Sequence, residues 1–496
     1  MKLWVTQFVV LTFFLCGSAP LAFAQAAPAS DLSEIKQILS EQARTIRVLK
    51  DRVEELEAEA TPPVEAAAAP ATEETDEADS AETSDVPSPT EDVEEQVRLG
   101  RRAPVVYRHA MNDRQAAAAR AGDYTLDPDY RGFIPVPNTA VMIKLNAKAR
   151  VDFIGDTGDP GTDFRFVPAK FPGNQRDGWQ FGANANGSQL IFNAEAPSVK
   201  GNPRFYYQND FFGSNDNHMN YRLQHLYGQY AGFLAGFTFG VFEDPDAWPS
   251  TVDYEGPNSV IFARRAVVQY QTMIFPDWEL TLSIEGPDVA VDTTGDANAE
   301  DRSRAPDGGF ALRWTPGDIG HIRMAGIVRS IAVDGGGNAA ASVNDFDDDD
   351  VIGWGINMSG NLKLSSRDNA QFWFVYGEGI GGMGNDTSFL NSDAAFKPSG
   401  NLEALEYFSS MVALTHQWSP RWDSTITHGY VDLENTNSQD SNFYHQSHYA
   451  SANLVYQVFT RMRIGVEGLY GRVKVNSGNV SEIFRIQAGI SFSIFD

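Results

Sequence analysis

The sequence of 496 residues is poor in cysteine, in basic residues and in long apolar runs. Its single cysteine, Cys16, excludes a disulfide framework within the chain. Lys and Arg number 38 against 66 Asp and Glu, and the net charge of −28 argues against nucleic-acid binding. After residue 24, no segment has the ~18 to 20 consecutive apolar residues of a membrane-spanning helix.

The first 24 residues have the pattern of a signal peptide. They contain Lys2, the apolar run LWVTQFVVLTFFL and the sequence Ala22-Phe23-Ala24, which fits an A-x-A cleavage site. The run is too short for a transmembrane anchor, so we predict export. Cys16 lies within this segment, and we therefore expect no thiol chemistry in the mature protein.

Residues 31–57 are predicted to form a coiled coil. Core positions are spaced alternately three and four residues apart, as in a heptad repeat: Leu32, Ile35, Leu39, Gln42, Ile46, Leu49, Val53 and Leu56. Leu at a with Ile at d in the first heptad favours more than two strands, whereas Ile or Val at a with Leu at d favours a pair. The segment RVEELE at 52–57 resembles a known trimer-favouring pattern, so we predict a trimer in the periplasm.

A linker is predicted over residues 58–97. From Glu57 to Glu95 the chain has 14 acidic residues and neither Lys nor Arg, interleaved with Ala, Pro, Thr and Ser. Such a segment buries too little apolar surface to fold and repels itself into an extended form. Residues 98–137 are expected to form a periplasmic segment before the folded domain, which we place at 138–496.

The folded domain is dominated by period-two alternation. In VMIKLNAKARVDF, at 141–153, apolar residues occupy the odd positions and mostly polar residues the even ones. Sixteen segments show comparable alternation: 140–154, 187–196, 203–212, 221–230, 233–242, 259–272, 278–286, 309–315, 320–332, 351–363, 369–378, 407–418, 422–431, 449–458, 461–471 and 482–495.

The links between these segments predict a transmembrane antiparallel β-barrel, an all-β fold. Short turns such as FPD, SPR and FTR alternate with long polar loops such as EDPDAWPSTVDYEGP. Sets such as Trp278, Leu280, Leu282 and Ile284 suit a lipid-facing wall with aromatic girdles. A soluble β-sandwich also alternates apolar and polar residues, but it rarely needs sixteen strands.

The last strand, FRIQAGISFSIFD, resembles the terminal signal by which bacterial barrels are recognised for insertion. This predicts contact with the barrel-assembly machinery, and then with outer-membrane lipid and lipopolysaccharide. The chain departs from the pattern in one respect, because Phe495 is penultimate and Asp496 follows.

Carrying the alternation through the strands predicts a basic lumen. The bases expected to face inward are Lys144, Lys148, Arg150, Arg204, Arg222, Arg265, Arg313, Arg323, Arg329, Arg461, Arg463 and Arg485. The inward acids are fewer: Asp152, Asp210, Glu279, Glu285, Glu378, Asp423 and Glu467. Guanidinium groups in a narrow passage favour anions. The alternative is that individual arginines only neutralise acids on adjacent strands.

The loop between the fifth and sixth strands is expected to fold inward and narrow the pore. Its Pro residues limit its flexibility, and Trp248 is a candidate anchor. Asp244, Asp246, Asp253 and Glu255 are then expected to face the strand that carries Arg264 and Arg265, which would create a field across the constriction. The alternative is an ordinary external loop.

Other clusters are less specific. The acidic run 345–350 suits a hard divalent cation, but a solvated loop is the simpler interpretation. His445 and His448 are too isolated for a metal site. Thr415-His416 and Thr427-His428 mark no nucleophile, so we predict no enzyme activity and no cofactor. A structural tether through the coiled coil remains an alternative function.

The segments GFIPVPNTAVMIKLNAKARVDF, WPSTVDYEGP and VIFARRAVVQY, together with the heptads, resemble the DcaP-like trimeric outer-membrane porins. The resemblance extends over essentially the whole mature chain. It implies a sixteen-stranded homotrimer in the Gram-negative outer membrane, with N-terminal helices in the periplasm. It also implies uptake of small negatively charged solutes, such as dicarboxylates or aromatic acids.

Overall fold

The computed structural model describes residues 132–494 except residue 163 and the segments 174–177, 197–202, 214–218, 294–298 and 335–348. The predicted signal peptide, coiled coil and linker lie outside the described residues, as do residues 98–131 and most of the acidic run. Within the described part of the chain, no helix has the length and apolar composition needed to cross a membrane.

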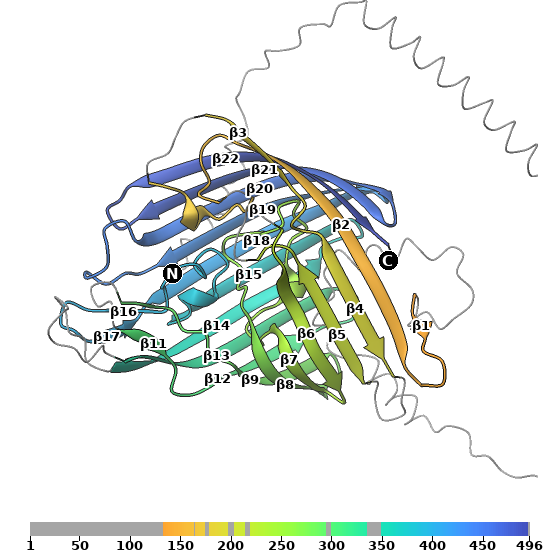
Figure 1. The fold of residues 1–496 in the computed structure, drawn as a ribbon, viewed down its shortest axis with the longest axis horizontal. Helices are drawn as coiled ribbons and strands as arrows, with labels where there is room; N and C mark the ends of the chain where they lie inside the picture. The colour runs from red at the N-terminus through yellow and green to blue at the C-terminus, as the bar shows by residue number, and fades with distance from the viewer. Residues whose placement is uncertain are drawn as a thin grey trace, which may run out of the picture. The chain divides into compact units, whose positions relative to one another are not determined.

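Sixteen antiparallel strands form a closed barrel (Figure 1). They are β2 (Met142–Asp156), β4 (Gln189–Glu195), β5 (Arg204–Asp210), β6 (Arg222–Tyr230), β7 (Phe233–Phe239), β8 (Arg264–Phe275), β9 (Trp278–Glu285), β12 (Asp307–Trp314), β13 (Gly320–Asp334), β14 (Asp349–Lys363), β15 (Asp368–Glu378), β18 (Glu406–Ser419), β19 (Trp422–Leu433), β20 (Tyr444–Phe459), β21 (Met462–Val475) and β22 (Val480–Ser493). The ring closes where β2 pairs with β22, from Lys148–Ser493 to Asp156–Arg485. No backbone edge of the ring is left unpaired, as a membrane barrel requires.

The prediction of sixteen strands is confirmed, but several strand ends differ from the predicted limits; the fourteenth strand, for example, begins at Tyr444 and not at 449. The fifth ends at Phe239 and the sixth begins at Arg264, whereas the sequence placed these limits at 242 and 259. Val260 and Ile261 are apolar and mimic a strand, but they belong to the connecting loop. There they are buried against other loops, which is why apolar pattern alone misplaced them.

Smaller elements extend some strands, at the end with short turns as well as at the end with long loops. β1 (Ile134–Pro135) and β3 (Gln180–Asn184) pair with β2, and β11 (Glu300–Arg302) pairs with β13. A separate sheet joins β10 (Val291–Asp292), β16 (Ala394–Phe396) and β17 (Leu402–Ala404) from two loops. Three 3₁₀ turns, η2 (Pro168–Lys170), η3 (Pro245–Ala247) and η4 (Gly381–Met383), lie in loops.

The two faces of the wall differ as the alternation predicts. On β2, Val151 and Phe153 are 39% and 42% exposed, whereas Arg150 and Asp152 between them are 6% and 1% exposed. Aromatic pairs such as Trp278–Trp314, with ring centroids 5.8 Å apart, lie at the end with short turns. This is the position of an interfacial girdle in a membrane barrel.

The inner face is less polar than the sequence suggested. Trp373, Tyr407 and Tyr449, from the walls β15, β18 and β20, are buried in one cluster with loop residues such as Phe242 and Ile261. The predicted basic lumen is therefore lined in this part by apolar side chains. Long loops enter the barrel and supply the apolar partners, which strand periodicity cannot reveal.

Candidate pore constriction

Residues 240–263, here called the inward loop, run from β7 to β8 through the interior of the barrel. Near its start, the side-chain amide of Asn357 on β14 donates to the Phe242 carbonyl at 2.6 Å. Farther along, Asn453 on β20 donates to the Ser250 carbonyl at 2.7 Å, and Arg150 on β2 donates to the Val252 carbonyl. The loop is thus bonded to distant parts of the wall.

The first limb of the loop is held by a short turn and an aromatic stack. Pro245 begins η3, where its fixed φ suits the first position of a helical turn. Trp248 follows and stacks on Phe262 with centroids 5.2 Å apart and planes at 28°. The guanidinium of Arg264 lies 4.4 Å from the Phe262 ring centroid. Trp248 therefore joins the two limbs of the loop, the anchoring position that the sequence suggested for it.

The tip of the loop fits a notch in the opposite wall. A Cβ added at Gly465 on β21 would lie 2.6 Å from the Val252 side chain, and one at Gly489 on β22 would lie 3.0 Å from it. Val252 therefore occupies space that any other residue at these two positions would fill. Gln487 contacts the Val252 carbonyl at 3.4 Å, and Arg150 donates to it as well.

The four loop acids have their nearest polar partners on other elements than β8, the strand that they were expected to face. Asp246 pairs with Arg313 on β12 at 2.7 Å, and Asp244 contacts His321 on β13 at 2.9 Å. Glu255 pairs with Arg165 at 3.5 Å, and Asp253 accepts from the Tyr449 hydroxyl at 3.2 Å. The expected partners on β8 lie elsewhere, because Arg265 pairs with Asp307 at 2.8 Å and also faces Glu285. Sequence reasoning placed the acids on the right loop but chose the wrong strand opposite them.

Burial and neighbouring charges shift the pKa values of the carboxyls on the inward loop in different directions. Burial raises the pKa of Glu243 to about 7, and the nearby carboxylate of Glu285 adds to this effect. Burial also raises the pKa of Asp253 to about 8, with a further contribution from Glu467. The loop therefore carries two carboxyls that change charge near neutral pH.

Asp244 behaves in the opposite way. Burial opposes its ionisation, but His321, Arg323 and Arg313 outweigh this effect and hold the pKa of the Asp244 carboxyl well below its usual range. The hydroxyl of Ser359 also donates to this carboxylate at 2.6 Å. Asp244 is therefore a permanent negative charge inside the barrel.

Most of the predicted inward bases lie in ion pairs. Apart from Arg461 and Arg463, ten of the predicted inward bases remain, and seven of these ten contact a carboxylate within 4 Å: Arg150, Arg204, Arg222, Arg265, Arg313, Arg329 and Arg485. Arg329 is fully buried between Asp307 and Asp393, at 3.0 and 2.9 Å. For these residues the alternative, that an arginine neutralises a nearby acid, describes what the structure shows.

The three others differ from this group. Lys144 and Lys148 are partly exposed on β2, and Arg323 on β13 donates to the Val241 carbonyl. The positive charges of Arg150 and Arg463 repel the Lys148 ammonium, whereas the carboxylate of Asp152 attracts it. Among the described residues, the Lys148 ammonium has neither a hydrogen bond nor an ion pair.

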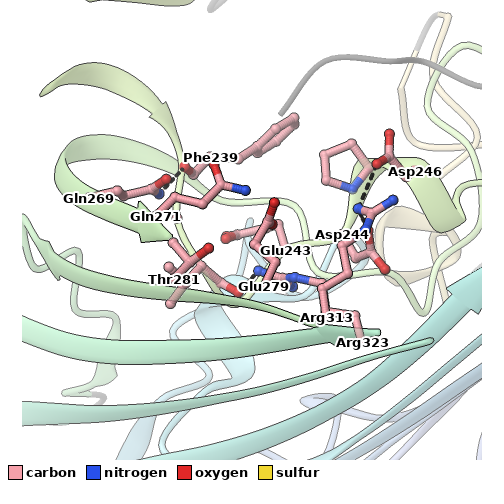
Figure 2. Close-up of a pocket in the computed structure, with 13 residues that line it drawn as sticks. Phe239, Glu243, Asp244, Asp246, Gln269, Gln271, Glu279, Thr281, Arg313 and Arg323 are labelled. Atoms are coloured by element: carbon pink, nitrogen blue, oxygen red, sulfur yellow. Dashed lines mark hydrogen bonds and ion pairs between the residues drawn. The ribbon is translucent and has the colours of Figure 1, made fainter. Parts of the chain in front are cut away.

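Two cavities flank the inward loop. One is lined by Arg150, Thr251, Val252, Val455, Arg463, Gly465, Gly489, Ile490 and Ser491. The other lies between the first limb of the loop and β8, β9, β12 and β13 (Figure 2). Its polar lining is formed by Glu243, Asp244, Asp246, Gln269, Gln271, Glu279, Thr281, Arg313 and Arg323.

Sequence reasoning missed several residues that shape the site. Tyr254 links the loop to the wall by donating to Asp210 at 2.9 Å. Asp386, from the loop after β15, accepts from Ser447 and from the Ala169 backbone at 2.9 Å. Asp386 lies in a turn-rich segment, so no local pattern marks it. Of the histidines that the sequence pointed to, His428 lies by His448, with ring centroids 5.8 Å apart, and His416 bonds to Asp368. No cluster of three or more metal-binding side chains occurs among the described residues.

The sequence matches the family DcaP outer membrane protein over residues 141–490. This chain belongs to the DcaP outer membrane protein family. The outer membrane channel DcaP of Acinetobacter baumannii is similar in structure, with 18% identity, a TM-score of 0.62, and coverage of 73% of this chain and 99% of that one. Among curated proteins, none matches this sequence.

More distant likenesses extend to other porins. Salmonella typhi OmpF in complex with daunomycin has 11% identity and a TM-score of 0.48, covering 73% of this chain and all of that one. An anion-selective porin from Comamonas acidovorans has 10% identity and a TM-score of 0.46, covering 71% of this chain and all of that one. The family match and the likeness to the A. baumannii channel identify this protein as an outer-membrane β-barrel with a channel fold.

Proposed function

We propose that this protein is a homotrimeric diffusion channel for small, negatively charged solutes such as dicarboxylates and aromatic acids. Support comes first from the inward loop, which is bonded to opposite sides of the ring, to Arg313 on β12 and to Gln487 on β22. A fixed loop of this kind makes every solute pass close to the remaining lining, where charge decides selectivity.

The observation that carries the proposal is the group formed by Lys148, Arg150 and Arg463 beside the loop tip. The Lys148 ammonium is repelled by the charges of both Arg150 and Arg463, and Asp152 is already bound by two hydrogen bonds from Arg150, at 2.7 and 2.8 Å. Like charges held together in a partly dehydrated space repel, and an anion between them relieves that repulsion. The cavity next to Val252 gives such an anion access to this group.

The assembly is also part of the proposal. The A. baumannii channel supports the fold and not the oligomer, so the trimer rests on the heptads at 31–57 and on the relatives, one of which is described as a trimer form. The tether role requires the same residues 31–57 to reach the cell wall and has no support in the barrel itself.

Recording in planar lipid bilayers tests the proposal. A trimeric channel should insert with three equal conductance steps, and a KCl gradient should give a reversal potential of the sign that indicates chloride preference. A cation-selective reversal potential would contradict the assignment of the lumen charges, and an absence of conductance would contradict the channel itself.

A further inference from the structure

The cavity between the inward loop and strands β8 to β13 contains polar atoms that have no partner. Glu243, Asp246 and Arg323 are 2%, 8% and 9% exposed, and all three line it. Within the described residues, Glu243 Oε2, Asp246 Oδ1 and Arg323 Nη1 make no hydrogen bond. Leaving a buried charged atom unsatisfied is costly, so the cavity is built to hold something that satisfies these atoms.

In each of these three side chains, one polar atom makes a hydrogen bond and another makes none. Glu243 Oε1 accepts from the Ala263 backbone at 3.3 Å, and Asp246 Oδ2 accepts from Arg313 at 2.7 Å. Arg323 donates through Nη2 to the Val241 carbonyl. The positions of the unsatisfied atoms are therefore set by contacts that already exist, as in a preorganised binding site.

The unsatisfied atoms are mostly acceptors. Gln271 Oε1 is also buried without a partner and lines the same cavity, so three acceptors accompany the single donor of Arg323. Figure 2 shows Gln271 and Glu243 next to each other, with Asp246 and Arg313 on the far side. A primary ammonium has three donors and no acceptor, and a carboxylate accepts from a guanidinium.

We propose that this cavity binds the ammonium group of a small anionic solute that also carries carboxylates, so that the channel favours acidic amino acids over simple dicarboxylic acids of equal length. The inference rests on the proposed channel function and narrows its solute class. The ammonium lies between Glu243 and Gln271, and a carboxylate faces Arg323. A bare metal ion fits less well, because Arg323 lines the same space and the described acids do not form a metal-binding cluster.

The far side of the lumen suits such a solute. The ring order places β9 and β12 seventh and eighth and β22 sixteenth, so the cavity lies across the barrel from Lys148 and Arg463. The side of the barrel that contains this cavity has four acids and two bases among the residues that line the cavity. The side across from it has the bases Lys148, Arg150 and Arg463 and the acid Asp152. A solute with separated charges is oriented by such a field as it passes.

The test compares L-glutamate with glutarate, which has the same carbon skeleton without the ammonium group. In single-channel recordings at pH 8, glutamate should block the current with a binding constant about fivefold higher than that of glutarate. Glu243→Gln should abolish the difference, because it removes the charge but keeps the size of the side chain. Glu195→Gln, which changes a lumen acid on β4, serves as the matched control and should keep the difference.

The outcomes separate the two proposals. If wild-type channels conduct KCl but bind glutarate as tightly as glutamate, the ammonium site is wrong and the channel function stands. The same conclusion follows if Glu243→Gln keeps the full preference for glutamate. If the purified protein conducts nothing, the channel function itself fails. Heat-modifiable mobility in gels confirms that each variant is folded.

Discussion

The Arg485 guanidinium donates to both carboxylate oxygens of Asp156, at 2.7 and 2.9 Å, where the last strand of the barrel meets the first. Arg485 is fully buried, and Asp156 is 3% exposed. Arg485 also contacts the carbonyls of Phe164 and Arg165 at 3.3 Å. One side chain thus connects the closure of the ring to the first long loop.

Replacing Arg485 should destabilise the barrel strongly. Arg485→Ala leaves the Asp156 charge buried without its partner, which typically costs about 3–5 kcal/mol. Urea unfolding in detergent micelles measures the loss. Arg302→Ala is the control, since its pair with Glu300 is more than half exposed and should change stability by about 0–1 kcal/mol at most. Equal losses in the two variants would contradict the role assigned to Arg485.

Replacing Lys148 should reduce anion selectivity. Lys148→Gln removes a cation that no carboxylate pairs with among the described residues, so we expect the chloride-to-potassium permeability ratio to fall about twofold. The reversal potential in a KCl gradient measures this ratio. Arg265→Gln is a useful contrast, because Asp307 and Glu285 already neutralise Arg265 and its loss should affect stability more than selectivity. A larger shift of selectivity for Arg265→Gln than for Lys148→Gln would reverse this assignment.

Filling the notch for Val252 should release the tip of the inward loop. Gly465→Ala puts a methyl group 2.6 Å from the Val252 side chain, so the tip has to move. We expect a larger and noisier single-channel conductance. The control is Gly468→Ala on the same strand, where the added methyl would lie 3.5 Å from Phe484, an ordinary contact. Unchanged conductance in both variants would mean that the tip does not limit the pore.

Docking of the loop tip should weaken as the pH rises. The Asp253 carboxyl faces Tyr449, Glu467, Glu255, Arg485 and Arg150, and its pKa is raised to about 8 from an ordinary value near 4. The docked loop therefore holds the proton more tightly than a released loop. Docking is strongest below pH ~4 and is progressively lost until the pH passes about 8.

Current noise between pH 6 and pH 9 measures this effect. Wild-type channels should become noisier towards pH 9, whereas Asp253→Asn, which cannot ionise, should stay quiet throughout. The same pH dependence in both would show that another group is responsible.

Deleting residues 31–57 should weaken the trimer more than the pore. If the heptads hold three chains together, the variant dissociates at a lower temperature in native gels while the conductance of each pore is kept. An oligomer that resists heat as well as the wild type would show that the barrel walls alone maintain it. This experiment tests the assembly proposed from the heptads independently of the lumen.

The wall of the barrel was predictable from the sequence, whereas the contents of its lumen were not. Along β9 or β14, alternate residues face the lipid and the lumen, and their alternating polarity shows this directly in the sequence. The number of strands and the side that each residue faces could therefore be predicted. The ion pairs depend instead on which distant residues meet: Arg329 and Asp393 are 64 positions apart and come together only because a loop turns inward. From the sequence alone, acids in the loops therefore could not be distinguished from solvated turn residues. Likewise, arginines that form ion pairs could not be distinguished from arginines that line an open pore.

The inward loop is attached on both sides of the ring, to Arg313 on β12 and to Gln487 on β22. A hollow cylinder bends easily out of round under lateral pressure from the surrounding lipid, because only its wall resists. A bonded segment across the diameter resists that flattening directly. The aperture should therefore keep its width when the bilayer is compressed or thinned, and solute passage should depend little on the lipid that surrounds the protein.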